Sequence, residues 1–253
     1  MRHGLVGGLA GIFLAAGLAT AAADEGREAA TFDVRLLGMS AGWLAISSVS
    51  IDGQYAVAAR LESGGFLGLL RHVAFEGRAR GAAGDDDLRP SRYEARSEMG
   101  RSWSHSIIAY DDGVPQLRYH ESSRDGQLAD IDPGTQGGTV DRATALYLAL
   151  RDVPRESLCD LDVAMYDGRR RARITLSPGE GAGNPEAARA TCRGEYRRLD
   201  GVALEEVEDQ QEAVRFELSY RAMGDGMMRV TRMQVATGFG TAVLDRRAEV
   251  AQR

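Results

Sequence analysis

The feature that most constrains the fold is a repeated pattern of strand, tight turn and strand, clearest in residues 32–81. Small or apolar side chains recur there at every second position, which is the period of a β-strand with one buried face. The alternating positions form three sets: Trp43, Ala45, Ser47, Val49 and Ile51; Tyr55, Val57, Ala59 and Leu61; Val73, Phe75, Gly77 and Ala79. Asp52-Gly53 separates the first two sets and is typical of two-residue hairpin turns. This stretch therefore predicts an antiparallel sheet.

The later chain repeats the pattern, with further hairpin dipeptides at Asp112-Gly113 and Asp167-Gly168. A single helix is predicted over Thr139–Arg151, where Thr139 or Asp141 can cap the first turn. Its composition is largely apolar, so it should pack against a sheet or plug the mouth of a barrel. The predicted fold is all-β: a large antiparallel curved sheet or open β-barrel of roughly ten to twelve strands, with one covering helix.

The N-terminus predicts export. Arg2 precedes an apolar run over Leu5–Ala19, and Ala21-Ala22-Ala23 offers small residues before acidic Asp24. This order is typical of a secretory signal peptide, and a retained membrane anchor is the alternative. We assign residues 1–23 to the signal peptide and residues 24–253 to a single β-rich domain. The predicted location is the periplasm, with peripheral membrane contact at most.

Composition narrows the class of partner. The chain has 253 residues and a formal net charge of -6, which argues against nucleic acid. All 31 basic residues are arginines. A preference for bidentate contacts with phosphate or carboxylate would explain this, but a bias in genome composition explains it more simply.

Two cysteines, Cys159 and Cys192, lie in the exported part and predict one disulfide in an oxidising compartment. The pairing raises a geometric difficulty. In a simple meander of the strands around them, the two residues would lie two strand spacings apart, roughly 9–10 Å, which exceeds disulfide reach. Either a strand bends over the end of the sheet, or the cysteines lie in curling loops.

No residues are assigned to catalysis, a metal or a cofactor. Ser104-His105-Ser106 places hydroxyls beside a histidine, but neighbouring strand residues point to opposite faces of a sheet. The other histidines of the exported part, His72 and His120, lie in no recognisable catalytic motif. Solvent-facing strand histidines are the favoured interpretation of all three.

Two groups of residues are candidates for ligand contact. The apolar run of Phe66, Leu67, Leu69 and Leu70 forms either a core-facing turn or the mouth of a ligand site, and the core is the default. Arg169, Arg171 and Arg173 follow a hairpin turn and would suit an anionic headgroup or phosphate. The simpler interpretation of these arginines is a solvated hairpin tip.

Short motifs along most of the exported chain resemble the bacterial DUF3108 family, a domain of unknown function in exported proteins. In order, they are Phe32-x-Val34, Gly38-x-x-Ala41-Gly42, Tyr55, Pro90-x-x-Tyr93, Tyr110-Asp111, Asp141-x-x-Thr144-Ala145 and Tyr166-Asp167-Gly168-Arg169. Arg142-Ala143 departs from the Pro-Leu of the family at the helix start. The resemblance implies an exported, mostly β protein with a curved sheet or open barrel, and it supplies no catalytic residues.

Two functional hypotheses follow. The favoured one is a non-catalytic protein of the cell envelope that binds a hydrophobic or lipid ligand, a polymer or another envelope protein. The alternative is a periplasmic hydrolase whose site is assembled from residues distant in the sequence. A large apolar interior cavity would favour binding, and clustered carboxylates or a histidine with a shifted pKa would favour an enzyme.

Overall fold

The computed structural model describes residues 26–65, 68, 72–84, 87–123, 131–184, 186–201, 213–238 and 240–248. Two runs of strands flank one helix. The first run is β1 (Gly26–Leu36), β2 (Met39–Ile51), β3 (Gln54–Ser63), β4 (Val73–Ala83), β5 (Leu88–Met99), β6 (Ser102–Asp111) and β7 (Val114–Ser122). The second run is β8 (Val153–Pro154), β9 (Asp162–Tyr166), β10 (Arg171–Pro178), β11 (Arg189–Asp200), β12 (Ala213–Ala222), β13 (Met227–Thr237) and β14 (Gly240–Arg246). The helix α2 (Arg142–Leu150) lies between the runs, with short 3-10 helices η1 (Pro133–Thr135) and η2 (Arg155–Ser157).

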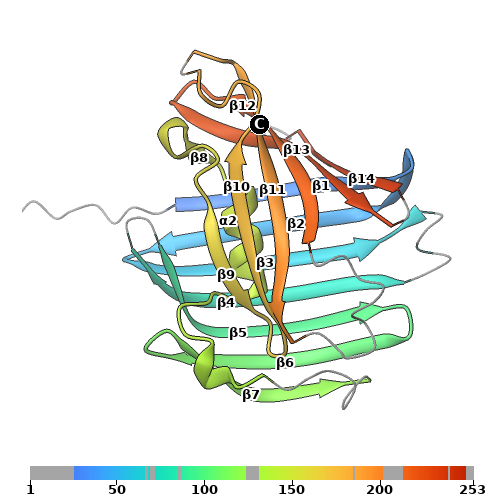
Figure 1. Cartoon of the computed structure of the whole chain (residues 1–253), viewed down its shortest axis with the longest axis vertical. Helices are drawn as coiled ribbons and strands as arrows, with labels where there is room; N and C mark the ends of the chain where they lie inside the picture. Colours follow the sequence, from blue (N-terminus) through green and yellow to red (C-terminus); the bar gives the residue numbers. More distant parts are fainter. Residues whose placement is uncertain are drawn as a thin grey trace, which may run out of the picture.

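All the strands belong to one antiparallel sheet, in the order β7-β6-β5-β4-β3-β2-β1-β14-β13-β12-β11-β10-β9, with β8 paired to β13. The first and last strands join the two runs, because β1 pairs with β14 around Val34 and Leu244. In Figure 1 the strands β9–β12 cross the stacked strands β1–β7 at a steep angle. The predicted all-β, barrel-like sheet with one helix is confirmed. The described part of the sheet has fourteen strands. One of them, β8, has only two residues, which is too short for a strand pattern to be visible in the sequence.

The helix α2 lies inside the fold, where it contacts β2, β3, β4, β5 and β9. It begins later than predicted, because Asp141 is its N-cap, and it ends at Leu150 before Arg151 and Pro154. Its fully buried face carries small side chains, including Ala143 and Ala145. Small side chains let a helix approach a sheet closely, so α2 fills the space between the two runs of strands.

The predicted core face holds for two of the three alternating sets. Tyr55, Val57 and Ala59 of β3 are buried, as are Phe75 and Ala79 of β4.

The predicted core face of β2 is wrong. Its buried residues are Leu44, Ile46 and Ser48, whereas Ser47 and Ile51 are exposed. Both faces of β2 carry apolar side chains, so the alternation did not distinguish them. The register with β3 does, because it aligns the Leu44 set with the buried side chains of β3.

Two of the three predicted Asp-Gly turns form as expected, whereas Asp167-Gly168 lies in a four-residue connection between β9 and β10 and Asp167 does not have a positive φ. Asp52 and Gly53 have φ values of 51° and 69°, and Asp112 and Gly113 have values of 47° and 75°. Positive φ at both central residues is the type I′ geometry, which matches the twist of the flanking strands. Aspartate and glycine adopt this conformation readily, so the dipeptide fixes the hairpin locally.

The predicted disulfide between Cys159 and Cys192 is present, with 5.4 Å between the Cα atoms. Strands β9, β10 and β11 nevertheless form the simple meander, in which the two residues were predicted to lie too far apart for a disulfide. Cys159 precedes β9 in a turn after η2 and has a φ of 63°. The chain therefore curls over the end of β10 toward Cys192 in β11, so both the pairing and the meander hold.

Candidate functional site

The family motif residues, which are far apart in the sequence, converge at the N-terminus of α2. The Tyr55 hydroxyl from β3 lies 3.1 Å from Oγ1 of Thr144, in the first turn of the helix. Tyr93, Tyr110 and Tyr166 lie around the same point. Burial raises the pKa of Tyr93 and of Tyr110, the charge of Asp141 raises both further, and Tyr166 in turn raises the pKa of Tyr110. We call Tyr55, Tyr93, Tyr110, Asp141, Thr144 and Tyr166 the buried polar cluster.

Asp141 is the central carboxylate of this cluster and is fully buried. Its Oδ1 accepts the backbone N–H of Thr144 at 2.9 Å, and its Oδ2 accepts the Thr144 hydroxyl at 2.7 Å. Burial raises the pKa of Asp141 to about 6, although the hydrogen bonds from Thr144 act in the opposite direction. Every contact of this carboxylate therefore serves the start of α2, and none leaves it open to a substrate.

The tyrosines contribute packing and hydrogen bonds around the buried polar cluster. The Tyr166 hydroxyl donates to the carbonyl oxygen of Gly168 at 2.7 Å. Burial, followed by the nearby charge of Asp141, raises the pKa of Tyr110 far above its ordinary value. The Tyr110 hydroxyl oxygen is buried and has no hydrogen-bond partner in the described part of the chain. These phenols stay neutral at physiological pH, so they contribute packing and hydrogen bonds rather than charge.

An ion pair fixes the outer edge of the cluster. Arg142 pairs with Asp167, whose Oδ1 also accepts the backbone N–H groups of Arg169 at 3.1 Å and Arg170 at 2.9 Å. Burial acts to raise the pKa of Asp167, but Arg142 and these N–H groups lower it overall. The Arg142 guanidinium also lies 5.3 Å from the centroid of the Phe75 ring. This pair ties the turn after β9 to the helix.

One serine–histidine pair does form inside the sheet. The Ser106 hydroxyl of β6 lies 2.9 Å from Nδ1 of His120 on β7. A β-carbon added to Gly168 would lie 3.4 Å from the Ser106 oxygen, so the turn after β9 packs directly on this hydroxyl. Ser106 is only 6 % exposed, which leaves no room for an acyl group at its oxygen.

The neighbouring histidine points the other way, as strand geometry requires. His105 has its Nε2 3.1 Å from the Glu94 carboxylate on the outer face, and its ring meets Tyr119 edge-on with 5.0 Å between centroids. As expected for neighbouring strand positions, His105 meets Glu94 whereas Ser104 meets Ser97 and Ser106 meets His120. The prediction that all the histidines face solvent is wrong for His120, because its strand turns that side chain toward Ser106.

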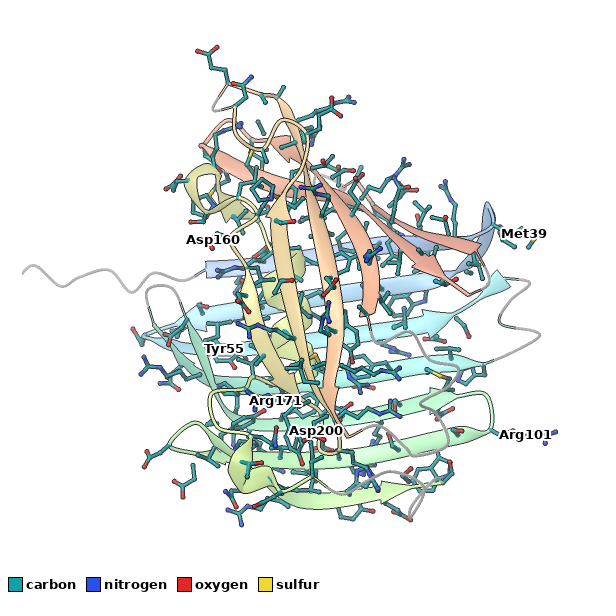
Figure 2. The ribbon with its side chains drawn as sticks, viewed as in Figure 1. Met39, Tyr55, Arg101, Asp160, Arg171 and Asp200 are labelled. Carbon is teal, nitrogen blue, oxygen red and sulfur yellow. A yellow bond between two sulfur atoms is a disulfide. The ribbon has the colours of Figure 1, made fainter. Side chains whose placement is uncertain are left out.

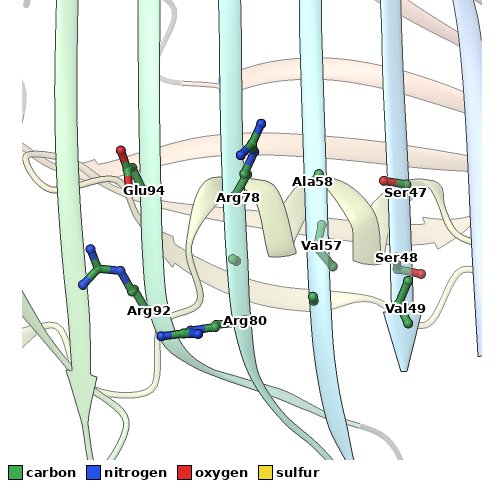
Figure 3. Close-up of a pocket in the computed structure, with 11 residues that line it drawn as sticks. Ser47, Ser48, Val49, Val57, Ala58, Arg78, Arg80, Arg92 and Glu94 are labelled. Carbon is green, nitrogen blue, oxygen red and sulfur yellow. The ribbon is translucent and has the colours of Figure 1, made fainter. Parts of the chain in front are cut away.

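A groove of about 490 Å³ lies on the outer face of β2–β5, on the opposite side of the sheet from α2 (Figure 3). Three arginines and one glutamate border it: Arg78, Arg80, Arg92 and Glu94. Small side chains form its floor, including Ser47, Ala56 and Ala58. Unlike the buried polar cluster, this groove is open to a ligand, and three of its four charged groups are arginines, which suit oxyanions.

A family model described as "Protein of unknown function (DUF3108)" matches residues 31–184, which is more than half of the chain. The chain belongs to the DUF3108 family. The match runs from β1 to just beyond β10, so it includes the buried polar cluster and the groove.

Two further comparisons give no function for this DUF3108 protein. No curated protein matches it. It is similar to a solved structure described as a "Beta-barrel-like Protein of Domain of Unknown Function DUF1849 from Brucella abortus". The two chains are 10% identical, with a TM-score of 0.40, and the likeness covers 87% of this chain and 98% of the other.

The predicted anion-binding arginines are engaged with neighbours. Arg173 pairs with Asp162 at 2.5 Å, and Arg171 donates to Oε1 of Gln136 at 3.1 Å. Arg171 also lies opposite Asp200 in the β10–β11 ladder (Figure 2). The backbone N–H of Arg169 donates to Oδ1 of Asp167. The prediction of a solvated hairpin tip is wrong, because Tyr166 anchors the turn to the core and Asp167 anchors it to α2.

The apolar run Phe66, Leu67, Leu69 and Leu70 lies outside the described residues. Among the residues that are described, no group of three or more histidine, cysteine, aspartate or glutamate side chains is placed to hold a metal ion.

Sequence reasoning did not single out the three groove arginines as a site. The spacing Pro90-x-x-Tyr93 nevertheless contains a signal for the bulge beside one of them, Arg92. Pro90 and Tyr93 are three positions apart yet both buried, which a regular strand does not allow. This spacing predicts a β-bulge, and the bulge leaves Ser91 and Arg92 both on the outside.

We expect Asp141 to make stability depend on pH. Its folded pKa of about 6 lies above the ordinary aspartate value, so its protonated form is favoured by folding. This contribution is complete below about pH 4 and is lost as the pH rises through about 6. Urea unfolding between these values should show wild type losing stability relative to Asp141→Asn, which keeps an oxygen acceptor for the Thr144 N–H. A constant difference between the two proteins would contradict this assignment. Asp167 acts in a separate window, because its lowered pKa removes stability only below about pH 4.

Proposed function

We propose that the DUF3108 protein is a non-catalytic, exported protein of the cell envelope that binds another envelope component through the outer face of its curved sheet. The observation that carries the proposal is the contrast between two sets of polar groups. Those inside are buried, and Tyr55, Asp141 and Thr144 are joined by hydrogen bonds at the start of α2. Those outside line an open groove that includes two arginines without partners in the described chain.

Location in the periplasm is part of the proposal. The N-terminal residues have the order of a signal peptide, and the Cys159–Cys192 disulfide fits an oxidising compartment. Within the described residues, no helix has the length and hydropathy needed to cross a membrane. We therefore propose an envelope partner reached in the periplasm, or peripheral contact with a membrane surface.

Packing of the interior supports a binding surface on the outside rather than a ligand within. α2 lies between the two runs of strands, and its Ala143 and Ala145 are fully buried. Phe32 of β1 and Leu218 of β12 are also fully buried. A hydrophobic ligand around the helix would have to displace these side chains, so we favour a polymer or an envelope molecule bound outside.

The second candidate is a hydrolase, and the Ser106–His120 contact is the observation in its favour. Nucleophilic catalysis needs an accessible hydroxyl and a histidine oriented by a third group. Ser106 instead lies under Gly168, and the histidine nitrogen facing it is Nδ1.

Complementation separates the two functions. In a strain that lacks this protein and shows a phenotype, Ser106→Ala and the triple variant His72→Gln, His105→Gln, His120→Gln should both restore the wild-type state, since neither changes the groove floor or its arginines. Circular dichroism and melting temperature must first establish that each variant is folded. Loss of complementation by a folded Ser106→Ala protein would reject the non-catalytic function and favour the hydrolase.

A further inference from the structure

The outer face of the β4–β5 ladder carries three facing pairs of charged residues beside the groove. They are Glu76 with Arg96, Arg78 with Glu94, and Arg80 with Arg92. The first two pairs join opposite charges, and the third joins like charges. Directly opposed like charges destabilise a sheet, so the third pair stands out in a ladder that is otherwise complementary.

No described carboxylate compensates Arg80 or Arg92. Arg78 is held by Glu76 at 2.6 Å. Glu94 is shared by His105 at 3.1 Å and Arg96 at 3.9 Å. Across the described residues, neither Arg80 nor Arg92 makes a hydrogen bond or ion pair through its side chain. Two exposed positive charges therefore face each other with no partner from the described chain.

A β-bulge lies directly beside the Arg80–Arg92 pair. The register of the ladder shifts between Arg80 and Gly81, and the Ser91 hydroxyl donates to the Arg80 carbonyl oxygen at 3.0 Å. A β-carbon at Gly81 would lie 1.9 Å from the carbonyl oxygen of Arg89, so the close approach of the two strands requires glycine. The bulge leaves Ser91 exposed next to Arg92 and buries Pro90, whereas Arg92 itself faces Arg80 in the same regular register as the two charged pairs before it.

The groove floor leaves space beside the two arginines. Ala56 lies opposite Arg80 on β3, and Ala58 lies opposite Arg78. On the next strand, Val49 faces Ala56 and Ser47 faces Ala58. Figure 3 shows Arg80 extending toward the strand that carries Arg92, away from this floor. Longer side chains at the two alanines would fill the space that a ligand needs next to the guanidinium groups.

The geometry points to this groove as a binding site for a phosphate-bearing envelope molecule, with Arg80 and Arg92 as its anion ligands. Two guanidinium groups can share the oxygens of one phosphate through paired N–H donors. A phosphate monoester carries close to two negative charges, which balances both arginines, whereas a carboxylate balances one. This inference rests on the proposed function and names the chemical class of its ligand.

The other half of the sheet offers a matched control. Arg193 of β11 is also exposed and also borders a groove on its sheet. It lies opposite Glu217, while Glu195 lies opposite Arg215, so the charges of that groove are compensated within the chain. Arg193→Ala therefore removes one positive charge from a sheet groove without touching the proposed site.

The experiment measures binding of inorganic phosphate, at constant ionic strength, by calorimetry and by the shift of the melting temperature. Wild type and Arg193→Ala should bind alike, whereas Arg80→Ala and Arg92→Ala should bind about tenfold more weakly or worse. Arg92→Glu should abolish binding, yet melt without ligand at or above the wild-type temperature, because a glutamate there would face Arg80 with opposite charge. Retained stability then shows that lost binding is not unfolding.

Two probes distinguish the source of the phosphate. Glycerol 3-phosphate stands for a soluble phosphate monoester, and vesicles that contain phosphatidic acid stand for a lipid whose headgroup is a phosphate monoester, with phosphatidylcholine vesicles as the neutral reference. Binding of either probe that Arg92→Glu abolishes supports the site. Absence of binding to phosphate and both probes, or equal weakening by Arg193→Ala, overturns it. If Ser106→Ala still complements in that case, the proposed function stands and only its ligand class is wrong.

Discussion

Replacing Asp141 with alanine is expected to lower the free energy of unfolding by about 3 kcal/mol. Two losses add to give this figure. The first turn of α2 loses its N-cap, and the buried Thr144 N–H and hydroxyl lose the acceptors that satisfy them. The Thr144 hydroxyl also meets Tyr55 of β3, so the change should loosen the contact between helix and sheet.

Chemical denaturation monitored by circular dichroism measures this effect, and Asp132→Ala is the matched control. Asp132 likewise caps a helix, since its Oδ1 accepts the Gly134 N–H at 2.8 Å, but it is exposed and η1 has only three residues. Its loss should cost less than about 1 kcal/mol. Equal stability losses in the two variants would mean that burial of Asp141 does not matter, and the buried polar cluster would lose its proposed structural role.

Local chemistry explains why much of the fold could be predicted. Asp52-Gly53 and Asp112-Gly113 adopt positive φ values that these residues tolerate regardless of the rest of the chain. Their hairpins follow, and a series of hairpins with one buried face predicts an antiparallel curved sheet. Asp141 was one of two expected helix caps for the same reason, because capping depends only on the first turn.

Predictions failed where the outcome depends on contacts between distant strands. The β2 sequence has apolar residues on both faces, and only its register with β3 buries Leu44 and Ile46. A solvated hairpin tip was predicted at Asp167 because the sequence there is polar, but Asp167 forms an ion pair with Arg142 of the helix. Such choices are made by tertiary packing, which a single strand's pattern does not record.

The candidate site depends on the same long-range information. Arg80 and Arg92 are unremarkable surface residues until the ladder sets one opposite the other. That pairing continues the register of Glu76 with Arg96 and Arg78 with Glu94, and the bulge, with Gly81 close to Arg89, follows directly after it. The spacing of Pro90 and Tyr93 indicates the bulge beside this pair, but only if both residues are known to face the core.

Removal of the disulfide by the double variant Cys159→Ala, Cys192→Ala is expected to lower the free energy of unfolding by about 3–4 kcal/mol. The bond closes a loop between residues 33 positions apart, so it restricts the unfolded chain substantially. In the folded protein it fastens the turn before β9 to β11, across the end of β10.

Wild-type protein reduced with dithiothreitol is the control, because it keeps both sulfur atoms and loses only the bond between them. Its free energy of unfolding should fall nearly as far as that of the double variant, with the remainder due to the volume lost at fully buried Cys192. Mass analysis of the protein purified under non-reducing conditions should find no alkylatable thiol. Two reactive thiols in that protein, or a reduced form as stable as the oxidised one, would show that the bond does not hold this corner of the sheet.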